Sequence, residues 1–343
     1  MKAKGTDGPQ SVEVPAPIEE SALLGRFFSI RTPISFVIAG VLLVVTWWLA
    51  DMKVADVWSH IRGANPLLIL AAYAVYAISF PLRTVRWRIL LSNAARREEI
   101  RPAYQNWTLF QILYISFFVN GILPLKLGDF YRAYLARANF RTSFTRTLGT
   151  IFAERVFDVA ILVGMVVLAA AYILRVVSVT EDVARIIAIA AGLLGVLVFG
   201  LGAMLVFGQP IVRHFPPRAQ GIYDRFHSGV FDCWTWGSGP SLWLISIAVW
   251  VAEMLRLLLV VRALGNELGP AQILFIGAAA SLMLAVPTPG GLGAVEGSMV
   301  GLLRMLGVSA SGAGAIAIVD RFITYWSLLL SGLVVFATAR LKR

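Results

Sequence analysis

The sequence predicts an all-α, polytopic membrane protein, and three observations support this fold class. Of its 343 residues, 58% are hydrophobic and only 14% are charged, which is not the composition of a soluble domain. Several apolar runs approach or exceed the roughly 20 helical residues that cross a bilayer. These runs also lack the two-residue alternation of an outer-membrane barrel. We therefore expect about six helical crossings in one membrane domain, residues 26–343, after a disordered tail at 1–25.

One apolar run contains a segment that cannot continue as a helix. PTPGGLGAVEG, residues 287–297, holds two prolines and four glycines. Proline removes a backbone donor, and glycine permits dihedrals that other residues avoid. Broken backbone is tolerated at membrane depth only where protein or water surrounds it. We expect this segment to wall an internal polar cavity that Glu296 faces, with the break shaped by Pro287, Pro289, Gly290, Gly291 and Gly293.

A second segment repeats this pattern. Pro124–Gly128 (PLKLG) matches Pro289–Gly293 (PGGLG), and P-x-x-L-G occurs nowhere else in the chain. An acid follows each segment, and an acid–arginine pair comes 30 residues after the first proline and 31 after the second: Asp129, Glu296, Glu154-Arg155 and Asp320-Arg321. Two matches at nearly equal spacing predict a duplicated unit.

The distribution of arginines orients the first crossings. The run at 34–50 follows Arg26 and Arg31, so its start is predicted to be cytoplasmic. The run at 66–82 leads into a basic cluster that fixes its end on the same side: Arg83, Arg86, Arg88, Arg96, Arg97 and Arg101. Trp87 is expected to anchor this end at the interface.

The third apolar run, residues 107–123, conflicts with the charge rule if it crosses fully, because five cationic residues between 126 and 146 would then lie outside. A re-entrant hairpin resolves the conflict. It enters from the cytoplasm, turns near Asn120, Gly121 and Pro124, and returns through residues 128–137, with Asn120, Pro124 and Gly128 shaping the break.

The remaining runs complete an inverted arrangement. Crossings are expected at 147–174, 184–207 and 242–261, followed by a hairpin from the outer side and a last crossing that returns to the cytoplasm: 271–286, 295–306 and 314–339. Three crossings separate the hairpins, and an odd number inverts the second unit. The repeat-like units are thus about 107–174 and 271–339, oppositely oriented.

Between two of these crossings, the stretch at 208–239 places apolar residues at i, i+4 spacing: Ile222, Phe226, Val230 and Trp234. This stripe predicts a helix on the membrane surface.

Ionisable residues inside the membrane should face the interior and have partners, because each costs roughly 2.5 to 3.5 kcal/mol at a helix centre. Helical spacing brings Arg132 within reach of Asp129 and Arg155 within reach of Asp158, which leaves Glu154 for another helix. Lys126 and Arg132 could receive an anionic headgroup, aided by the helix start after Gly128. The alternative is a set of structural ion pairs. The expected substrate-binding residues are Lys126, Asp129, Arg132, Glu154, Arg155, Asp158, Glu296, Asp320, Arg321 and Tyr325.

Other chemistries find little support in the sequence. It has one cysteine, three scattered histidines, no nucleotide-binding glycine loop after a strand and no Ser-His-Asp order. We expect no metal, no cofactor, no catalytic residue and no nucleic-acid partner. The net charge of +11 fits a positive-inside bias, and arginine also suits phosphate-bearing headgroups.

Five segments resemble the flippase-like membrane family typified by the transmembrane region of lysylphosphatidylglycerol synthase. They are RTVRWRILL (83–91), NGILPLKLGDFYRAY (120–134), ERVFD (154–158), PTPGGLGAVEG (287–297) and DRFITYW (320–326). The resemblance implies a bacterial inner-membrane protein that moves or handles lipid between leaflets. The synthase's cytosolic aminoacyl-transferase domain is absent from this sequence, so the resemblance carries neither aminoacyl-lipid synthesis nor lysylphosphatidylglycerol as the substrate.

Three functions are therefore weighed. The first is a translocator of an anionic membrane lipid, with both termini cytoplasmic. The second is a non-transporting subunit that scaffolds or regulates a partner enzyme of lipid or glycan synthesis. The third and weakest is an intramembrane enzyme that uses the buried carboxylates. The sequence does not give the lipid, the direction, the energy source or the oligomeric state.

Overall fold

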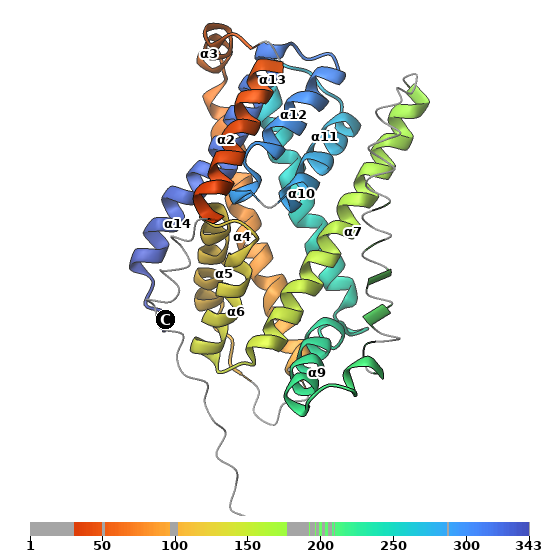
Figure 1. Ribbon diagram of the computed structural model, residues 1–343. Coiled ribbons are helices and arrows are strands. Elements are labelled where there is room, and N and C mark those ends of the chain that lie inside the picture. The colour runs from red at the N-terminus through yellow and green to blue at the C-terminus, as the bar shows by residue number, and fades with distance from the viewer. Residues whose placement is uncertain are drawn as a thin grey trace, which may run out of the picture.

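The computed structural model describes residues 31–49, 52–96, 102–176, 211–286 and 288–342, with scattered positions between 192 and 210. Within these residues the regular secondary structure is helical, which confirms the all-α fold class (Figure 1). The expected tail at 1–25, most of the crossing at 184–207, and Pro287 lie outside the described residues.

In chain order the elements are α2 (Arg31–Leu49), α3 (Val54–Arg62), α4 (Pro66–Ala94), α5 (Asn106–Ile122), α6 (Leu127–Phe140), α7 (Phe144–Val176), α9 (Pro217–Phe231), α10 (Gly239–Ala263), α11 (Pro270–Leu282), the 3-10 turns η1 (Met283–Ala285) and η2 (Pro289–Gly291), α12 (Ala294–Met305), α13 (Ala310–Arg321), the π-helical turn η3 (Phe322–Trp326) and α14 (Ser327–Thr338).

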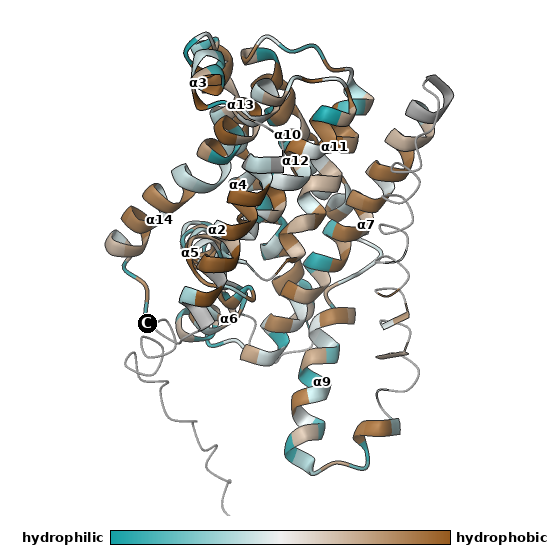
Figure 2. Cartoon of the chain, turned by 45° about the horizontal axis from the view of Figure 1, so that its top comes forward, coloured by the Kyte–Doolittle hydropathy of each residue, from teal (hydrophilic) through white to brown (hydrophobic). Residues whose placement is uncertain are grey.

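Among the described residues, three helical segments are long and apolar enough to cross a membrane by themselves. They are α4, α10 and the run Ala310–Thr338, which joins α13, η3 and α14. Figure 2 shows hydrophobic residues along the helices of the bundle. These segments confirm a polytopic membrane protein.

Helix α4 continues beyond the predicted crossing at 66–82, as its helical spacing through Trp87 indicates. It begins at Asn65, whose side chain accepts hydrogen bonds from the backbone N–H groups of Leu67 and Leu68, and continues to Ala94. The prediction that Trp87 anchors this end at the interface is wrong, because its side chain is fully buried. Arg83 and Arg86 on this part of α4 have partners inside the protein, so charge does not end the buried part of the helix.

Both predicted backbone breaks are present. Helix α5 ends at Ile122 and α6 begins at Leu127, while α11 and α12 are separated by the irregular segment that contains η1 and η2. Figure 1 shows α5 and α6 in the lower half of the molecule and α11 and α12 in the upper half. The two helical hairpins thus enter the bundle from opposite ends, as the predicted inverted arrangement requires.

The two breaks meet at the centre of the bundle. The hydroxyl of Tyr325, on the π-helical turn, donates a 3.0 Å hydrogen bond to the backbone carbonyl of Gly121 at the end of α5. Gly290 in η2 lies against Gly121, since a Cβ at Gly290 would lie 3.5 Å from the Gly121 Cα. This contact joins the two breaks and satisfies a carbonyl that the end of α5 leaves free.

The helix predicted within 208–239 is present as α9, and its place on the membrane surface stays a prediction. Helix α9 packs against α7, where Gly149 and Gly229 allow the two backbones to approach closely. Part of the stripe faces protein: the Phe226 ring lies 5.8 Å from Phe152 of α7, between ring centroids, and Val230 is buried, whereas Ile222 is 53% exposed.

Gly293 tests the packing of the second break. Its φ is +82°, and a Cβ there would lie 2.4 Å from the Leu42 Cβ of α2. We expect Gly293→Ala to lower the free energy of unfolding by about 1–3 kcal/mol, because it adds both backbone strain and overpacking. Thermal unfolding in detergent measures the change. Gly301→Ala in α12 is the control, since nothing lies within 4 Å of its added methyl; equal effects of the two variants would contradict this packing.

Candidate functional site

The first break is held by a polar cluster at the start of α6. The Asn120 side chain accepts a hydrogen bond from the Gly128 N–H (2.8 Å) and donates one to Asp129 (3.0 Å). Asp129 in turn accepts two bonds from Arg155 of α7, at 3.0 and 3.2 Å. An arginine fork on a carboxylate is among the strongest polar contacts in proteins. The pair therefore fixes the returning helix of the hairpin to α7.

The second break is held in the same way at the start of α12. Glu296 accepts a bond from the Gly293 N–H (2.7 Å), which caps the helix, and another from Nε of Arg321 (2.7 Å). Arg321 also donates to the Gly290 carbonyl at 2.8 Å. One arginine of α13 thus fixes both the turn and the helix that follows it.

These two arrangements correspond residue by residue. Asp129 and Arg155 are 26 residues apart, and Glu296 and Arg321 are 25 apart. The acid before each arginine pairs with an arginine from the long helix that precedes the hairpin: Glu154 with Arg86 of α4, and Asp320 with Arg256 of α10. The equivalence therefore includes α4 and α10, which lie side by side and are joined by an Arg83–Glu253 ion pair of 3.0 Å.

Arg86 is the most connected cation of the first unit. Its side chain is 1% exposed and donates to Glu154 (2.8 Å), to both oxygens of Asp158 (2.7 and 3.1 Å) and to Ser246 of α10 (3.1 Å). The indole N–H of Trp250 donates to the same Asp158. These bonds join α4, α7 and α10 in the interior.

Helical spacing predicted that Arg132 pairs with Asp129. It does not, because Arg155 binds that carboxylate. Instead, Arg132 is fully buried, lies 3.0 Å from Glu154, and stacks with its guanidinium 3.8 Å from the centre of the Trp87 ring. Its Nε and Nη1 have no hydrogen-bond partner among the described residues. The predicted Arg155–Asp158 contact is present but long, at 3.9 Å.

The charges of these pairs balance, and one further cation is left over. Six arginines pair with six carboxylates: Arg83, Arg86, Arg132, Arg155, Arg256 and Arg321 with Asp129, Glu154, Asp158, Glu253, Glu296 and Asp320. Lys126 is exposed, and no carboxylate among the described residues is within ion-pair distance of it. It sits at the turn of the first hairpin, with positive φ at both Leu125 and Lys126. Such strain outside glycine is concentrated at functional sites.

The structure therefore brings the predicted site residues together, but most of them are buried and paired with one another. Asp129, Arg132, Glu154, Arg155 and Asp158 form one cluster, whereas Glu296, Arg321 and Tyr325 form a second around the other break, and Asp320 contacts α10. The expectation of an open polar chamber is not met in this conformation, because the buried arginines and carboxylates neutralise one another directly. Lys126 and the 27% exposed side chain of Arg155 are the accessible cations beside the first break.

Four charged residues were not predicted as part of the site. Arg83 and Arg86 were assigned to a cytoplasmic cluster, and Glu253 and Arg256 lie in the run predicted as the crossing at 242–261. The structure gives each of them a partner on another helix as well. The signal that could have found them is the repeat itself, because Arg86 precedes Glu154 by 68 residues and Arg256 precedes Asp320 by 64.

The role of Arg86 can be tested against its neighbour Arg88 on the same helix. We expect Arg86→Met to lower the free energy of unfolding by about 3–5 kcal/mol, since it leaves buried carboxylates without their main partner. Arg88 is exposed and bonds only Asn106 among the residues described, so Arg88→Met should cost about 1 kcal/mol or less. Thermal unfolding of both variants measures the difference, and a mild effect of Arg86→Met would mean that the network does not hold the bundle.

Comparison with known proteins gives a family and several relatives. The family model described as the lysylphosphatidylglycerol synthase TM region matches residues 34–332. A UPF0104 membrane protein of Methanocaldococcus jannaschii is 30% identical over 224 residues, which cover 64% of this chain and 93% of that protein. A UPF0104 membrane protein of Methanothermobacter thermautotrophicus is 25% identical over 345 residues, covering 92% and 96%.

One relative has a name that states an activity. The glycosyltransferase AglD of Haloferax volcanii is 27% identical over 327 residues, which cover 83% of this chain but only 51% of that protein. The similarity therefore concerns about half of the glycosyltransferase.

Proposed function

The protein belongs to the lysylphosphatidylglycerol synthase TM-region family, and on that premise we propose that it moves an anionic or phosphate-bearing lipid between the two leaflets of the membrane. The observation that carries the proposal is Lys126, an exposed cation in excess of six balanced ion pairs, placed at the turn of the first hairpin. A charge on a hairpin within the membrane is costly unless something neutralises it. A phosphate on a lipid headgroup is a suitable partner.

Arg155 is the second group that would meet the headgroup. Its guanidinium already binds Asp129 through two nitrogens, yet over a quarter of the side chain is exposed. A phosphate between Lys126 and Arg155 would compete with Asp129 for the same N–H groups. Phosphate binding would therefore weaken the Asp129–Arg155 pair that holds the first hairpin to α7. In this way, binding of the lipid headgroup would be coupled to movement of the hairpin.

Arg132 supplies a reserve of hydrogen-bond donors deeper in the protein. Its unpartnered Nε and Nη1 cannot reach a headgroup while they are sealed against Trp87. If the hairpin moves, these donors become available to the phosphate or to water. The Glu296–Arg321 ion pair fixes the second hairpin in the same way from the opposite end. Alternating access through inverted repeats requires such a matching pair on each side.

The charge distribution supports an orientation. The ends of α4 and α6, the start of α7, and α9 lie at one end of the molecule (Figure 1) and carry most of its exposed arginines. The positive-inside rule makes this end cytoplasmic. The chain end at Lys342 hydrogen-bonds Asn139 at the same end. We place the protein in a bacterial inner membrane with both termini cytoplasmic, acting without a cofactor or a catalytic residue.

A second candidate is a membrane subunit that scaffolds or regulates a partner enzyme of lipid or glycan synthesis. It is favoured by the relative named a glycosyltransferase, of which this chain matches about half. A scaffold acts through its outer surface, so it would keep its function when Lys126 or Arg155 is neutralised.

Leaflet exchange in proteoliposomes separates the two functions. We expect Lys126→Gln to slow the exchange of fluorescent phosphatidylglycerol by about tenfold or more, the effect of losing one charge-assisted hydrogen bond of about 1.5–3 kcal/mol. Lys126→Arg should keep most of the activity, because it keeps the charge. Phosphatidylcholine, whose headgroup has no net charge, should exchange more slowly than phosphatidylglycerol.

Arg62→Gln is the control for general loss of charge, since Arg62 is exposed at the end of α3 and contacts only Trp58 among its described neighbours. Its exchange rate should equal that of the unmodified protein. If the unmodified protein shows no exchange above empty vesicles, or if Lys126→Gln and Arg62→Gln behave alike, headgroup binding at Lys126 is wrong.

A further inference from the structure

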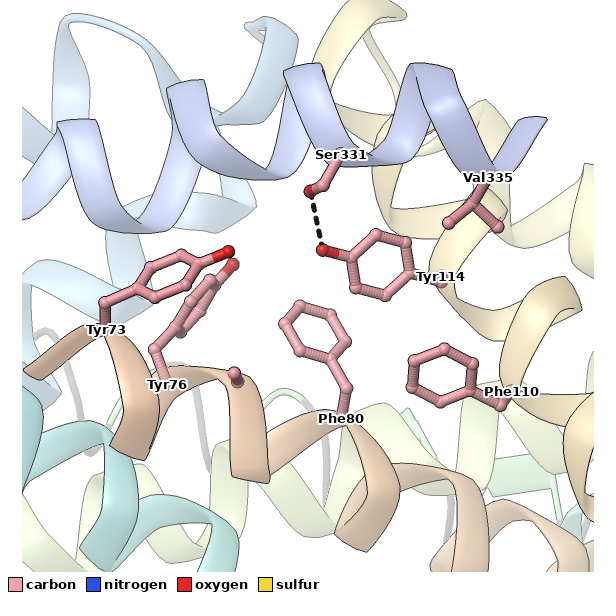
Figure 3. A pocket seen from close by; sticks show the side chains of 8 residues that line it. Tyr73, Tyr76, Phe80, Phe110, Tyr114, Ser331 and Val335 are labelled. Carbon is pink, nitrogen blue, oxygen red and sulfur yellow. Dashed lines mark hydrogen bonds between the residues drawn. The ribbon is translucent and has the colours of Figure 1, made fainter. Parts of the chain in front are cut away.

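A cavity of about 240 Å³ lies between α4, α5 and α14, beside the ion pairs. Figure 3 shows Tyr73, Tyr76 and Phe80 of α4 pointing into it toward α14, with Phe110 and Tyr114 of α5 closing one side. Tyr73 and Phe80 are two helical turns apart, about 10 Å along the axis. The cavity is therefore elongated in the direction of α4, which is one of the membrane-spanning helices.

The cavity suits a hydrocarbon chain. Three of its four hydroxyl groups are hydrogen-bonded: Tyr114 hydrogen-bonds Ser331 at 2.7 Å, and Tyr76 donates to the Thr324 carbonyl at 2.9 Å. Apart from the Tyr73 hydroxyl, the rest of the lining is aromatic faces, Ala77 and Val335. An apolar cavity of about 150 Å³ is large enough to bind benzene. This cavity is larger and would take a longer apolar group.

The surroundings of the cavity are apolar as well. Ile78 of α4 and Leu330 and Val334 of α14, next to lining residues, are 58%, 64% and 60% exposed. On helices that cross a membrane, such residues face lipid. The cavity is thus entered from the hydrocarbon region.

A row of aromatic rings connects the cavity to the proposed headgroup site. Phe80 in the cavity wall lies 5.6 Å from Phe117, between ring centroids, and the guanidinium of Arg155 lies 5.9 Å from the Phe117 ring. Arg83 stacks on the same ring at 5.5 Å. Only one ring therefore separates the apolar cavity from the cation that would hold a phosphate.

We propose that this cavity binds a hydrocarbon tail of the lipid whose headgroup is held at Lys126 and Arg155. The inference rests on the proposed function for the identity of the headgroup site. It adds that the lipid is held at two points, and that the tail remains in a groove open to the bilayer while the headgroup is inside the protein. A lipid without a chain that fills the groove would bind less tightly than one that fills it.

Photo-crosslinking of the full-length protein in vesicles tests this proposal. Two probes are used, a phosphatidylglycerol with a diazirine on its acyl chain and a polyprenyl phosphate with a diazirine on its isoprenoid chain. Mass spectrometry locates the labelled residues. We expect at least one probe to label residues of the cavity wall, and the probe that does so identifies the class of tail.

Variants that fill the cavity supply the comparison. Ala77→Trp from α4 and Val335→Trp from α14 should each reduce labelling of the wall by about tenfold, the change that 1.4 kcal/mol produces. Ala74→Trp is the matched control, because Ala74 is exposed on the same helix one turn earlier and does not line the cavity. Thermal unfolding checks that all three variants fold.

Labelling spread evenly over the lipid-facing surface, or equal labelling in Ala77→Trp and Ala74→Trp, would overturn the proposal. Labelling confined to the cavity in a protein that shows no leaflet exchange would support tail binding while rejecting translocation. Leaflet exchange with no labelling of the cavity would support translocation and reject tail binding in the cavity.

Discussion

Charged side chains and broken backbone cannot face hydrocarbon, and the structure satisfies both constraints with the same ion pairs. Arg321 neutralises Glu296 and also donates to the Gly290 carbonyl, so one side chain supports a buried charge and an irregular turn. At the first break Arg155 neutralises Asp129, and Asn120 bonds both Asp129 and the Gly128 N–H of the turn. Because each break is fixed by an arginine from the following helix, the position of both hairpins depends on these two pairs.

The correspondence between the two halves has a mechanical consequence. Each hairpin packs on the last helix of the other unit, α5 on α14 and α11 on α7, while α4 and α10 lie together at the centre. The described conformation closes the charges off. Each hairpin is fixed by one carboxylate–arginine pair. Opening one hairpin while the other closes therefore need not change the number of buried ion pairs. Lys126 breaks this symmetry, because the second unit has a glycine, Gly291, at the corresponding place in P-x-x-L-G.

Backbone chemistry predicted the breaks, whereas side-chain partners were harder to predict. Proline and glycine act locally, so the ends of α5 and α11 could be placed to within a few residues. Partners depend on which helices adjoin. Helical spacing alone paired Arg132 with Asp129, but Arg155 from α7 takes that carboxylate. The charge rule placed Arg86 in the cytoplasm, because its acidic partners Glu154 and Asp158 lie on a different helix and only the packing of α4 on α7 reveals them.

The most direct test of the central claim is an experimental density map of the full-length protein in nanodiscs that contain phosphatidylglycerol. The account predicts that the turn after α5 contacts the turn between α11 and α12 inside the bilayer, and that headgroup density lies beside Lys126 and Arg155. Two turns separated by lipid, or density for phosphatidylglycerol only around the outer surface, would contradict it.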